Sequence, residues 1–291
     1  WMRLQDRPRF RASASVRFRT LAEAAGAVRA LSQSGLQPTN CRLLDANEVA
    51  ANHVGGEGPL LVLGFESADH PLSAWMERAL ELALATREKL DDSGATLALI
   101  GRAGQDLSKY GLRYSHFGFA WRDHPKGRWR VVHELNECGT ANSDIYDEGL
   151  ANFFLDDLWR MEAVILLPSP ATQEKLSSFL AARKHLALHS GHYSMVAYPF
   201  STRYQNSNQW ALEVFAAAAA RDAPVNNREQ AQQWLKFAGY QPTELKLDAI
   251  TRLGARVSRA NIAFDDHPGE LRWSDRIRTV TVESVFRFVE A

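Results

Sequence analysis

The sequence predicts an α+β fold in which an antiparallel sheet packs against helices. Residues 95–100 form an apolar run typical of a buried strand, and residues 129–135 also have strand character. The turn-forming segment 123–127 joins this second run to the strand-like segment before it, which indicates an antiparallel hairpin. Helices with recognisable N-terminal caps begin near Ser169 and Ser207.

Composition excludes several classes of protein. The 291 residues carry 34 basic and 34 acidic side chains, and this balance argues against a dedicated surface for nucleic acid or anionic membrane. No apolar run approaches the roughly 20 residues of a membrane span. The first residues, WMRL, lack the apolar segment of a signal peptide. Two cysteines, Cys41 and Cys138, are too few for a disulfide framework or a cysteine zinc site.

Residues 1–72 predict a small α/β unit. Thr20 and Glu23 have the spacing of a capping box that opens a helix, and Gly35 follows the end of that helix. Segments with strand character lie at 14–18, 41–44 and 60–65. The order strand, helix, strand, strand is that of half a ferredoxin-like unit.

Residues 73–291 predict a second, larger domain. Apolar residues recur at helical spacing from Ser73 to Leu90, and the sheet segments described above follow. The remaining predicted elements are helices at 170–189, 207–221 and 226–239 and strands at 163–167 and 278–283. We therefore place the domain boundary between residues 72 and 73.

His116 is the leading candidate for a functional residue. It lies in an aromatic run where strand alternation puts Tyr114, His116 and Gly118 on one face. A titratable imidazole on a rigid strand, beside a glycine that leaves room, suits a general base. The structural alternative is a partly buried histidine whose hydrogen bonds are satisfied within the protein.

Several motifs of the second domain resemble those of a bacterial domain family of unknown function. They are GQDLS at 104–108, RYSH at 113–116, NFFLDD at 152–157, PFSTRYQNSNQW at 199–210 and FDDHP at 264–268. The order of His116, His133 and Ser207 is also similar to that of circularly permuted papain-like hydrolases, such as the NlpC-type peptidases and the lecithin retinol acyltransferase group. In those proteins the order is histidine, polar orienting residue, then a cysteine at a helix N-terminus.

This resemblance implies a permuted papain-like core with three catalytic positions. His116 takes the place of the base, His133 that of the orienting residue, and Ser207 that of the cysteine. A helix N-terminus lowers a thiol pKa and stabilises an oxyanion, but a serine is far less acidic and depends on its base. Ser207 is therefore open to three interpretations: a serine nucleophile, a mutated cysteine or a plain N-cap of the helix.

The resemblance therefore implies a hydrolase that acts on an amide or acyl bond, in cell-envelope material, in an active or a degenerate form. Its substrate is a small molecule or a peptide or acyl compound. A binding or scaffold module with the same fold and no chemistry is the second hypothesis. The family also implies bacterial export to the periplasm, although no signal peptide is visible, and the oligomeric state stays open.

Further polar residues are candidates for contacts with a substrate. Arg113 and Tyr114 precede His116, and Gln209 follows Ser207. Cys138, in the loop after the strand of His133, is an alternative thiol nucleophile, but a lone cysteine beside a glycine is more often structural.

Three histidines, at positions 185, 189 and 192, are spaced near one helical face and invite a metal site. Gly191 interrupts that helix, and the sequence offers no obvious carboxylate partner. We therefore expect exposed surface histidines and no metal.

The N-terminal segment resembles a different family. The runs WMRLQ at 1–5, AVRAL at 27–31, NCRLLD at 40–45 and LGFESADHP at 63–71 are similar to part of a flavin-linked oxidase, in the alkyldihydroxyacetone-phosphate synthase and glycolate oxidase-like group. This region of such enzymes joins the flavin domain to the substrate cap. The part that cradles the flavin pyrophosphate is absent, and no glycine-rich phosphate loop replaces it, so we expect no FAD. A fragment of a flavin-dependent oxidoreductase is the third functional hypothesis. Because the two resemblances cover different segments, the chain resembles a fusion of parts of two families.

Overall fold

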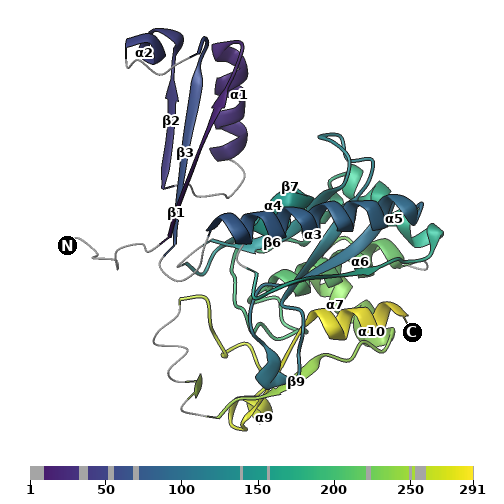
Figure 1. The fold of residues 1–291 in the computed structure, drawn as a ribbon. Coiled ribbons are helices and arrows are strands. Elements are labelled where there is room, and N and C mark those ends of the chain that lie inside the picture. The colour runs from purple at the N-terminus through teal and green to yellow at the C-terminus, as the bar shows by residue number, and fades with distance from the viewer. Residues whose placement is uncertain are drawn as a thin grey trace. The chain divides into compact units, whose positions relative to one another are not determined.

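A computed structural model describes the chain in nine segments. They are residues 10–32, 39–51, 56–67, 72–137, 140–155, 158–220, 224–248, 251–252 and 260–290. Two compact units emerge, one of residues 1–83 with 154–156 and one of residues 84–153 with 157–291 (Figure 1). The predicted α+β class is confirmed, because each unit combines an antiparallel sheet with helices. The predicted boundary between residues 72 and 73 falls in the first turn of α3 (Leu72–Asp92). The compact units divide further along the same helix, between residues 83 and 84.

The first unit contains a three-stranded antiparallel sheet in the order β1-β3-β2. Its strands are β1 (Phe10–Arg17), β2 (Asn40–Leu44) and β3 (Leu60–Ser67), and its helices are α1 (Leu21–Ser32) and α2 (Ala46–Ala51). The predicted capping box opens α1. The amide of Glu23 donates to Oγ1 of Thr20 at 3.2 Å, and Oε2 of Glu23 accepts from the amide of Thr20 at 3.3 Å.

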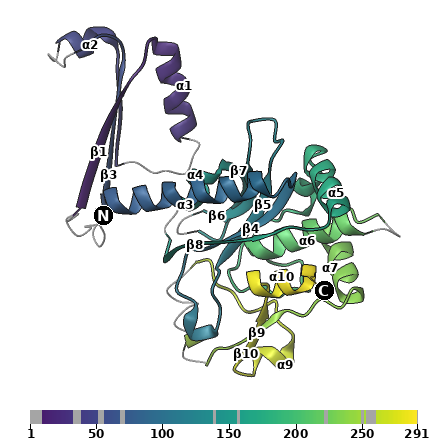
Figure 2. The ribbon, with the colours of Figure 1, turned by 45° about the vertical axis from the view of Figure 1, so that its right-hand side comes forward.

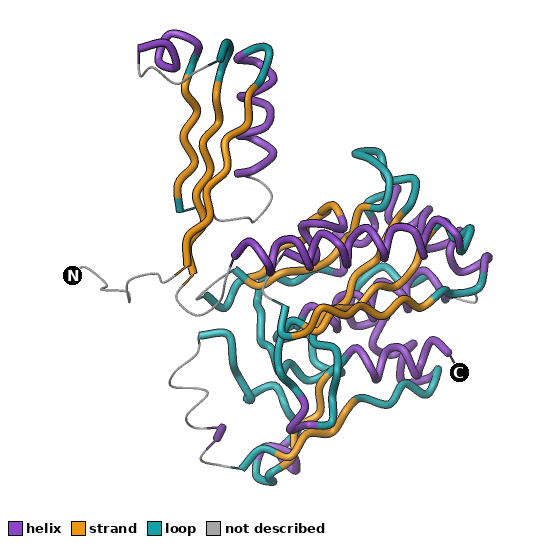
Figure 3. Tube along the Cα trace, in the orientation of Figure 1, coloured by secondary structure: helices purple, strands orange, loops and turns teal. Residues whose placement is uncertain are grey.

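The second unit is built on a five-stranded antiparallel sheet in the order β7-β6-β5-β4-β8. Strands are drawn in orange in Figure 3. The strands are β4 (Leu97–Ala103), β5 (His116–Trp121), β6 (Arg130–Asn136), β7 (Ser143–Gly149) and β8 (Arg160–Leu166). The predicted hairpin is confirmed, because β5 and β6 pair antiparallel. Strand β7 is not among the predicted elements; it is an edge strand with three acidic residues, a composition that strand patterning does not favour.

Helices cover one face of this sheet and form the main hydrophobic core. They include α5 (Pro170–Ala181), α6 (Ser207–Ala219) and α10 (Val282–Glu290); α6 and α10 lie on one side of the sheet in both views (Figures 1 and 2). Phe117 and Phe119 of β5 belong to this core, and the ring of Phe119 meets that of Trp210 of α6 edge to face. We call this the α6 face of the sheet.

The opposite face carries His116, because successive side chains of β5 point to alternate faces. The register of the sheet places Arg102, Gly118, His133 and Glu148 on the same side as His116. We call this the histidine face.

Two predicted elements are wrong in extent. The helix predicted from 170 to 189 ends at Ala181, because Arg183 adopts a left-handed backbone with φ of 56°, and a 3-10 helix η2 (Lys184–Leu188) follows. The strand predicted at 278–283 covers parts of two elements, β10 (Arg276–Thr279) and α10. The hydroxyl of Thr281 caps α10 by accepting from the amide of Ser284 at 3.2 Å.

The remaining elements lie in the second unit, except that the last residues of α4 are assigned to the first. They are η1 (Ser108–Tyr110), α4 (Leu150–Leu155), α7 (Arg228–Phe237), β9 (Thr243–Lys246), which pairs with β10, and α9 (Gly269–Arg272). Asn227 caps α7, since its Oδ1 accepts from the amide of Gln230 at 2.9 Å. Of the helices in the described segments, none has both the length and the apolar character needed to cross a bilayer.

Candidate functional site

The structure brings two of the predicted catalytic residues together on the histidine face. Nε2 of His116 lies 2.8 Å from Nδ1 of His133 on the neighbouring strand. Gly118 makes the room, because a Cβ at that position would lie only 2.8 Å from the Cβ of His133. On the next strand, Oε2 of Glu148 lies 3.5 Å from Nε2 of His133. The imidazoles of His116 and His133 and the carboxylate of Glu148 are therefore neighbours in a row across three adjacent strands.

This series is enclosed by protein. His116 is 8% exposed and His133 is fully buried, and the ring of Phe153 packs against both imidazoles. Burial, followed by the charge of Arg102, lowers the pKa of His116 well below its usual range. The lowered pKa keeps the His116 ring neutral, and its short contact with His133 links adjacent strands and offers little access to a substrate.

Ser207 does not join the histidines. It is the first residue of α6, on the α6 face, and the N-cap is Asn206, whose side chain accepts from the amide of Gln209 at 2.8 Å. Ser207 is hydrogen-bonded to the phenol of Tyr193; burial raises the pKa of this phenol, and the Ser207 hydroxyl acts in the opposite direction. The structure thus places His116 and Ser207 on opposite faces of the sheet.

The other predicted contact residues are engaged within the protein. Nε of Arg113 donates to Glu162 at 2.9 Å, and the amide of Tyr114 donates to Glu283 at 2.9 Å. The side-chain amide of Gln209 donates to the buried Glu213 of its own helix at 3.1 Å. Cys138 lies outside the described residues.

A second serine and a second histidine meet on the α6 face. Oγ of Ser143, the first residue of β7, lies 3.3 Å from Nε2 of His189, which follows η2. The same oxygen lies 3.3 Å from the carbonyl of Ser190, and the amide of Ser143 donates to the carbonyl of Gly191 at 3.2 Å. The strand and the loop are therefore fixed to each other at this point.

Glu134 of β6 completes this arrangement, which we call the acid–serine–histidine cluster (Glu134, Ser143 and His189). The side chain is fully buried on the α6 face, and within the described segments neither carboxyl oxygen has a hydrogen-bond partner of normal geometry. Burial raises the pKa of Glu134 to about 8, the Ser143 hydroxyl acts to lower it, and the charge of Glu213 raises it further. At neutral pH this carboxyl carries a proton.

His189 is neutral at the same pH. Burial lowers its pKa, and the charge of Asp144 opposes this effect. A neutral imidazole beside a serine hydroxyl has the protonation state of a general base, and a protonated carboxyl is a hydrogen-bond donor.

A buried polar network supports the loop of His189. Glu213 of α6 is fully buried and accepts from Gln205, Gln209, Arg228 and Gln232 at distances of 2.7 to 3.3 Å. Gln205 connects this network to the cluster, because its Oε1 accepts from the amide of Ser190 at 2.7 Å. Nε2 of Gln205 also donates to the carbonyl of Leu188 at 2.9 Å, so positions on both sides of His189 are tied to the core.

Sequence patterns gave no direct signal for this cluster. Ser143 begins an acidic edge strand, and His189 falls within the segment predicted as helix, so neither stands in a recognisable motif. The spacing of the histidines at 185, 189 and 192 did single out His189, but the expectation that these are exposed surface histidines is wrong for the first two, because His185 is buried and His189 is half-buried. In the segments that the structure describes, no three His, Cys, Asp or Glu side chains are arranged to hold a metal ion.

Comparison with known protein families finds two matches. A family described as "Uncharacterized protein conserved in bacteria (DUF2145)" matches residues 89–289, and one described as "FAD linked oxidases, C-terminal domain" matches residues 7–109. Both resemblances predicted from sequence are thereby confirmed, and the first match covers more than half of the chain. No curated protein and no solved structure matches the chain.

The second match raises the question of whether the first unit fits a flavin. Its glycine turn at residues 56–58 is closed by its own chain: a Cβ on Gly58 would lie 2.5 Å from the carbonyl oxygen of Phe18. The guanidinium of Arg17 lies 3.5 Å from the carbonyls of Glu57 and Gly58. A pyrophosphate site needs open space and converging N–H groups, so this turn does not fit the phosphates of FAD.

Proposed function

The chain belongs to the bacterial family DUF2145, and from that premise and the acid–serine–histidine cluster we propose that its larger unit is a hydrolase of acyl or amide bonds. In this proposal Ser143 is the nucleophile, His189 is the general base and Glu134 is a proton-bearing donor. The observation that carries it is the 3.3 Å contact between Oγ of Ser143 and Nε2 of His189. A nucleophile within hydrogen-bond reach of a neutral base is the basic requirement of this chemistry.

The proposed reaction has two halves. Oγ of Ser143 attacks the acyl carbon while its proton passes to Nε2 of His189, and the carbonyl oxygen becomes an oxyanion. The protonated imidazole then gives this proton to the leaving amine or alcohol as the bond to the acyl carbon breaks. Water attacks the acyl-serine, again with His189 as base, and releases the acid and the free hydroxyl of Ser143.

Glu134 contributes through its proton. A carboxyl kept neutral by burial donates a hydrogen bond where an ionised carboxylate would repel the oxyanion. The raised pKa of Glu134, about 8, supports this role at neutral pH.

Hydrolysis of p-nitrophenyl acetate by the full chain tests the proposal. We expect Ser143→Ala and His189→Gln each to lower kcat/KM by about 10³-fold or more, because the pair acts as a unit. Ser108→Ala is the matched control, since its hydroxyl is exposed and, among the described residues, bonds to Asp106 in the adjoining turn. Circular dichroism spectra establish that each variant is folded. Equal rates for wild type and both cluster variants would contradict the proposal.

A binding module without chemistry is the second candidate. The burial of Glu134 and Ser143, which are 0% and 6% exposed, favours it, because a buried polar network also specifies a fold. Under this alternative Ser143→Ala and His189→Gln lower the free energy of unfolding, and the rate of ester hydrolysis is the same as that of the wild type. A papain-like arrangement with His116, His133 and Ser207 stays a prediction from sequence, as does export to the cell envelope. No step of the proposal involves flavin.

A further inference from the structure

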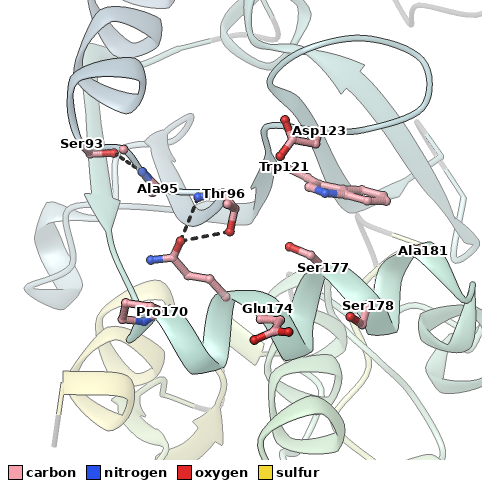
Figure 4. Close-up of a pocket in the computed structure, with 12 residues that line it drawn as sticks. Ser93, Ala95, Thr96, Trp121, Asp123, Pro170, Glu174, Ser177, Ser178 and Ala181 are labelled. Atoms are coloured by element: carbon pink, nitrogen blue, oxygen red, sulfur yellow. Dashed lines mark hydrogen bonds between the residues drawn. The ribbon is translucent and has the colours of Figure 1, made fainter.

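A pocket of about 630 Å³ beside α5 offers a ligand few polar groups (Figure 4). The hydroxyl of Ser177 is buried, the indole of Trp121 is 8% exposed, and Oε1 of Gln173 accepts from the amide of Thr96 at 2.9 Å. A second pocket, of about 500 Å³, differs because the consecutive residues 244–248 border it. It lies between η1 and β9, and we call it the β9 groove.

Strand β9 has one free edge. Among the described strands it pairs with β10 alone, and the two lie side by side in Figure 2. The amide of Leu247 donates to the carbonyl of Asp275 at 2.8 Å, just beyond the paired strands. Because hydrogen-bonded and non-hydrogen-bonded pairs alternate in an antiparallel sheet, the amides and carbonyls of Glu244 and Lys246 point away from β10. Within the described segments these backbone groups have no hydrogen-bond partner.

The other edge of this two-stranded sheet is covered. By the same alternation the carbonyl of Arg278 in β10 points away from β9, and Nε2 of His267 donates to it at 3.0 Å. The imidazole is buried, and its Nδ1 lies 2.9 Å from Oδ1 of Asp266, so the segment FDDHP at 264–268 closes this side. The edge of β9 is therefore the one at which the sheet can grow, and a two-stranded sheet gains stability from a third strand.

The opposite wall of the β9 groove is fixed by apolar packing. Tyr110 of η1 packs against the cluster of Leu245, Leu247 and Ile277, which holds η1 beside β9. The outward-pointing backbone groups of β9 recur at every second residue, or about every 6.6 Å, which is the repeat of an extended peptide. The groove thus presents a preformed edge and the space beside it.

The β9 groove has an excess of positive charge. Lys109 and Lys246 line it, both are exposed, and neither has an ion-pair partner in the described segments. The carboxylate of Glu244 is shared between two arginines of β10, at 3.4 Å each, and Asp248 accepts from the amide of a neighbouring threonine at 2.7 Å. Four basic side chains therefore accompany two carboxylates. A second copy of this edge would bring the same excess, so an acidic partner is favoured.

We propose that an acidic peptide in extended conformation binds in the β9 groove as a third strand. Its carbonyls accept from the amides of Glu244 and Lys246, and its own amides donate to the carbonyls of these two residues. Its acidic side chains lie near Lys109 and Lys246, where opposite charges attract. This inference goes beyond the proposed hydrolase and does not depend on it.

Fluorescence anisotropy with the full chain tests the proposal on three fluorescein-labelled heptapeptides. The first alternates glutamate and valine, the second is the same peptide with every backbone amide N-methylated, and the third has lysine in place of glutamate. We expect saturable binding of the first and binding weaker by about tenfold or more for the others, because one lacks the backbone donors and the other carries the repelling charge. No saturable binding of the glutamate peptide overturns the proposal, as does equal affinity for either of the other two.

Variants of Glu244 then locate the binding at β9. Glu244→Pro removes an outward-pointing amide and no bond to β10, which an edge strand tolerates, and should weaken binding of the glutamate peptide by about tenfold. Glu244→Gln is the matched control, because it removes the same negative charge and keeps the amide, so its affinity should equal or exceed that of the wild type. Circular dichroism establishes that both variants are folded, and the three-peptide comparison needs neither of them.

Two further outcomes would overturn the proposal. Equal affinity of the two Glu244 variants would show that the peptide does not pair with this edge. Sedimentation that shows a dimer of the wild-type chain, lost in Glu244→Pro, together with no peptide binding, would assign the edge to a second copy of the chain.

Discussion

The hydroxyl oxygen of Ser143 lies 3.3 Å from Nε2 of His189, although 46 positions separate the two residues in the chain. The backbone bond from Ser143 to Gly191 and the isolated bridge between Asn142 and His192 hold the contact from both sides. The pair is thus positioned by backbone structure before any substrate arrives. Such preorganisation is what a nucleophile and its base require.

Glu134 should make the protein less stable as the pH rises toward 8. Its folded pKa is raised to about 8 from an ordinary 4.5, so between these values the folded state keeps a proton that the unfolded state releases. The free energy of unfolding then falls with rising pH, by up to about 1.4 kcal/mol per pH unit, and levels off above the folded pKa. Urea unfolding at a series of pH values checks this.

Glu134→Gln is the informative variant for that experiment, because the amide stays neutral at every pH. We expect its stability to change less than that of the wild type between neutral pH and about pH 9. A pH dependence identical to that of the wild type would show that Glu134 does not carry the proton.

Gly118→Ala should destabilise the second unit. The new Cβ would lie 2.8 Å from the Cβ of His133 and 2.9 Å from the carbonyl of Val132, and backbone cannot move aside cheaply. We expect a loss of about 1–3 kcal/mol in the free energy of unfolding, the usual cost of overpacking. Gly149→Ala is the control, because nothing lies within 4 Å of its added Cβ. A loss no larger than that of the control would contradict the close packing of β5 and β6 at the histidines.

His116 should make the protein sensitive to acid. Its pKa in the folded state is lowered well below 6.5, so the unfolded chain takes up a proton that the folded chain refuses once the pH falls below about 6.5. The contribution of neutral His116 to the free energy of unfolding is therefore fully present above about pH 6.5 and is lost as the pH falls below it. Denaturant titrations of wild type and His116→Gln at neutral and mildly acidic pH should give a smaller acid-induced loss for the variant; equal losses would mean that His116 is not the responsible group.

Local features of the fold were predictable from sequence, and the candidate site was only partly so. The hairpin of β5 and β6 follows from alternation and a turn, and it brings His116 and His133 within reach of each other. Which face α6 covers depends on packing: the contact of Phe119 with Trp210 places Ser207 away from His116, and no local pattern encodes it. Ser143 and His189 meet only through tertiary structure, because an acidic edge strand and a short 3-10 segment carry neither periodicity nor a motif.

Labelling with a fluorophosphonate probe tests the central claim most directly. Such a probe reacts with a serine whose hydroxyl is activated by a neighbouring base, and mass spectrometry identifies the modified residue. The proposed function predicts an adduct on Ser143 that disappears in His189→Gln and persists in Ser108→Ala. An adduct on Ser207, or no adduct on any serine of the folded wild-type chain, would contradict it.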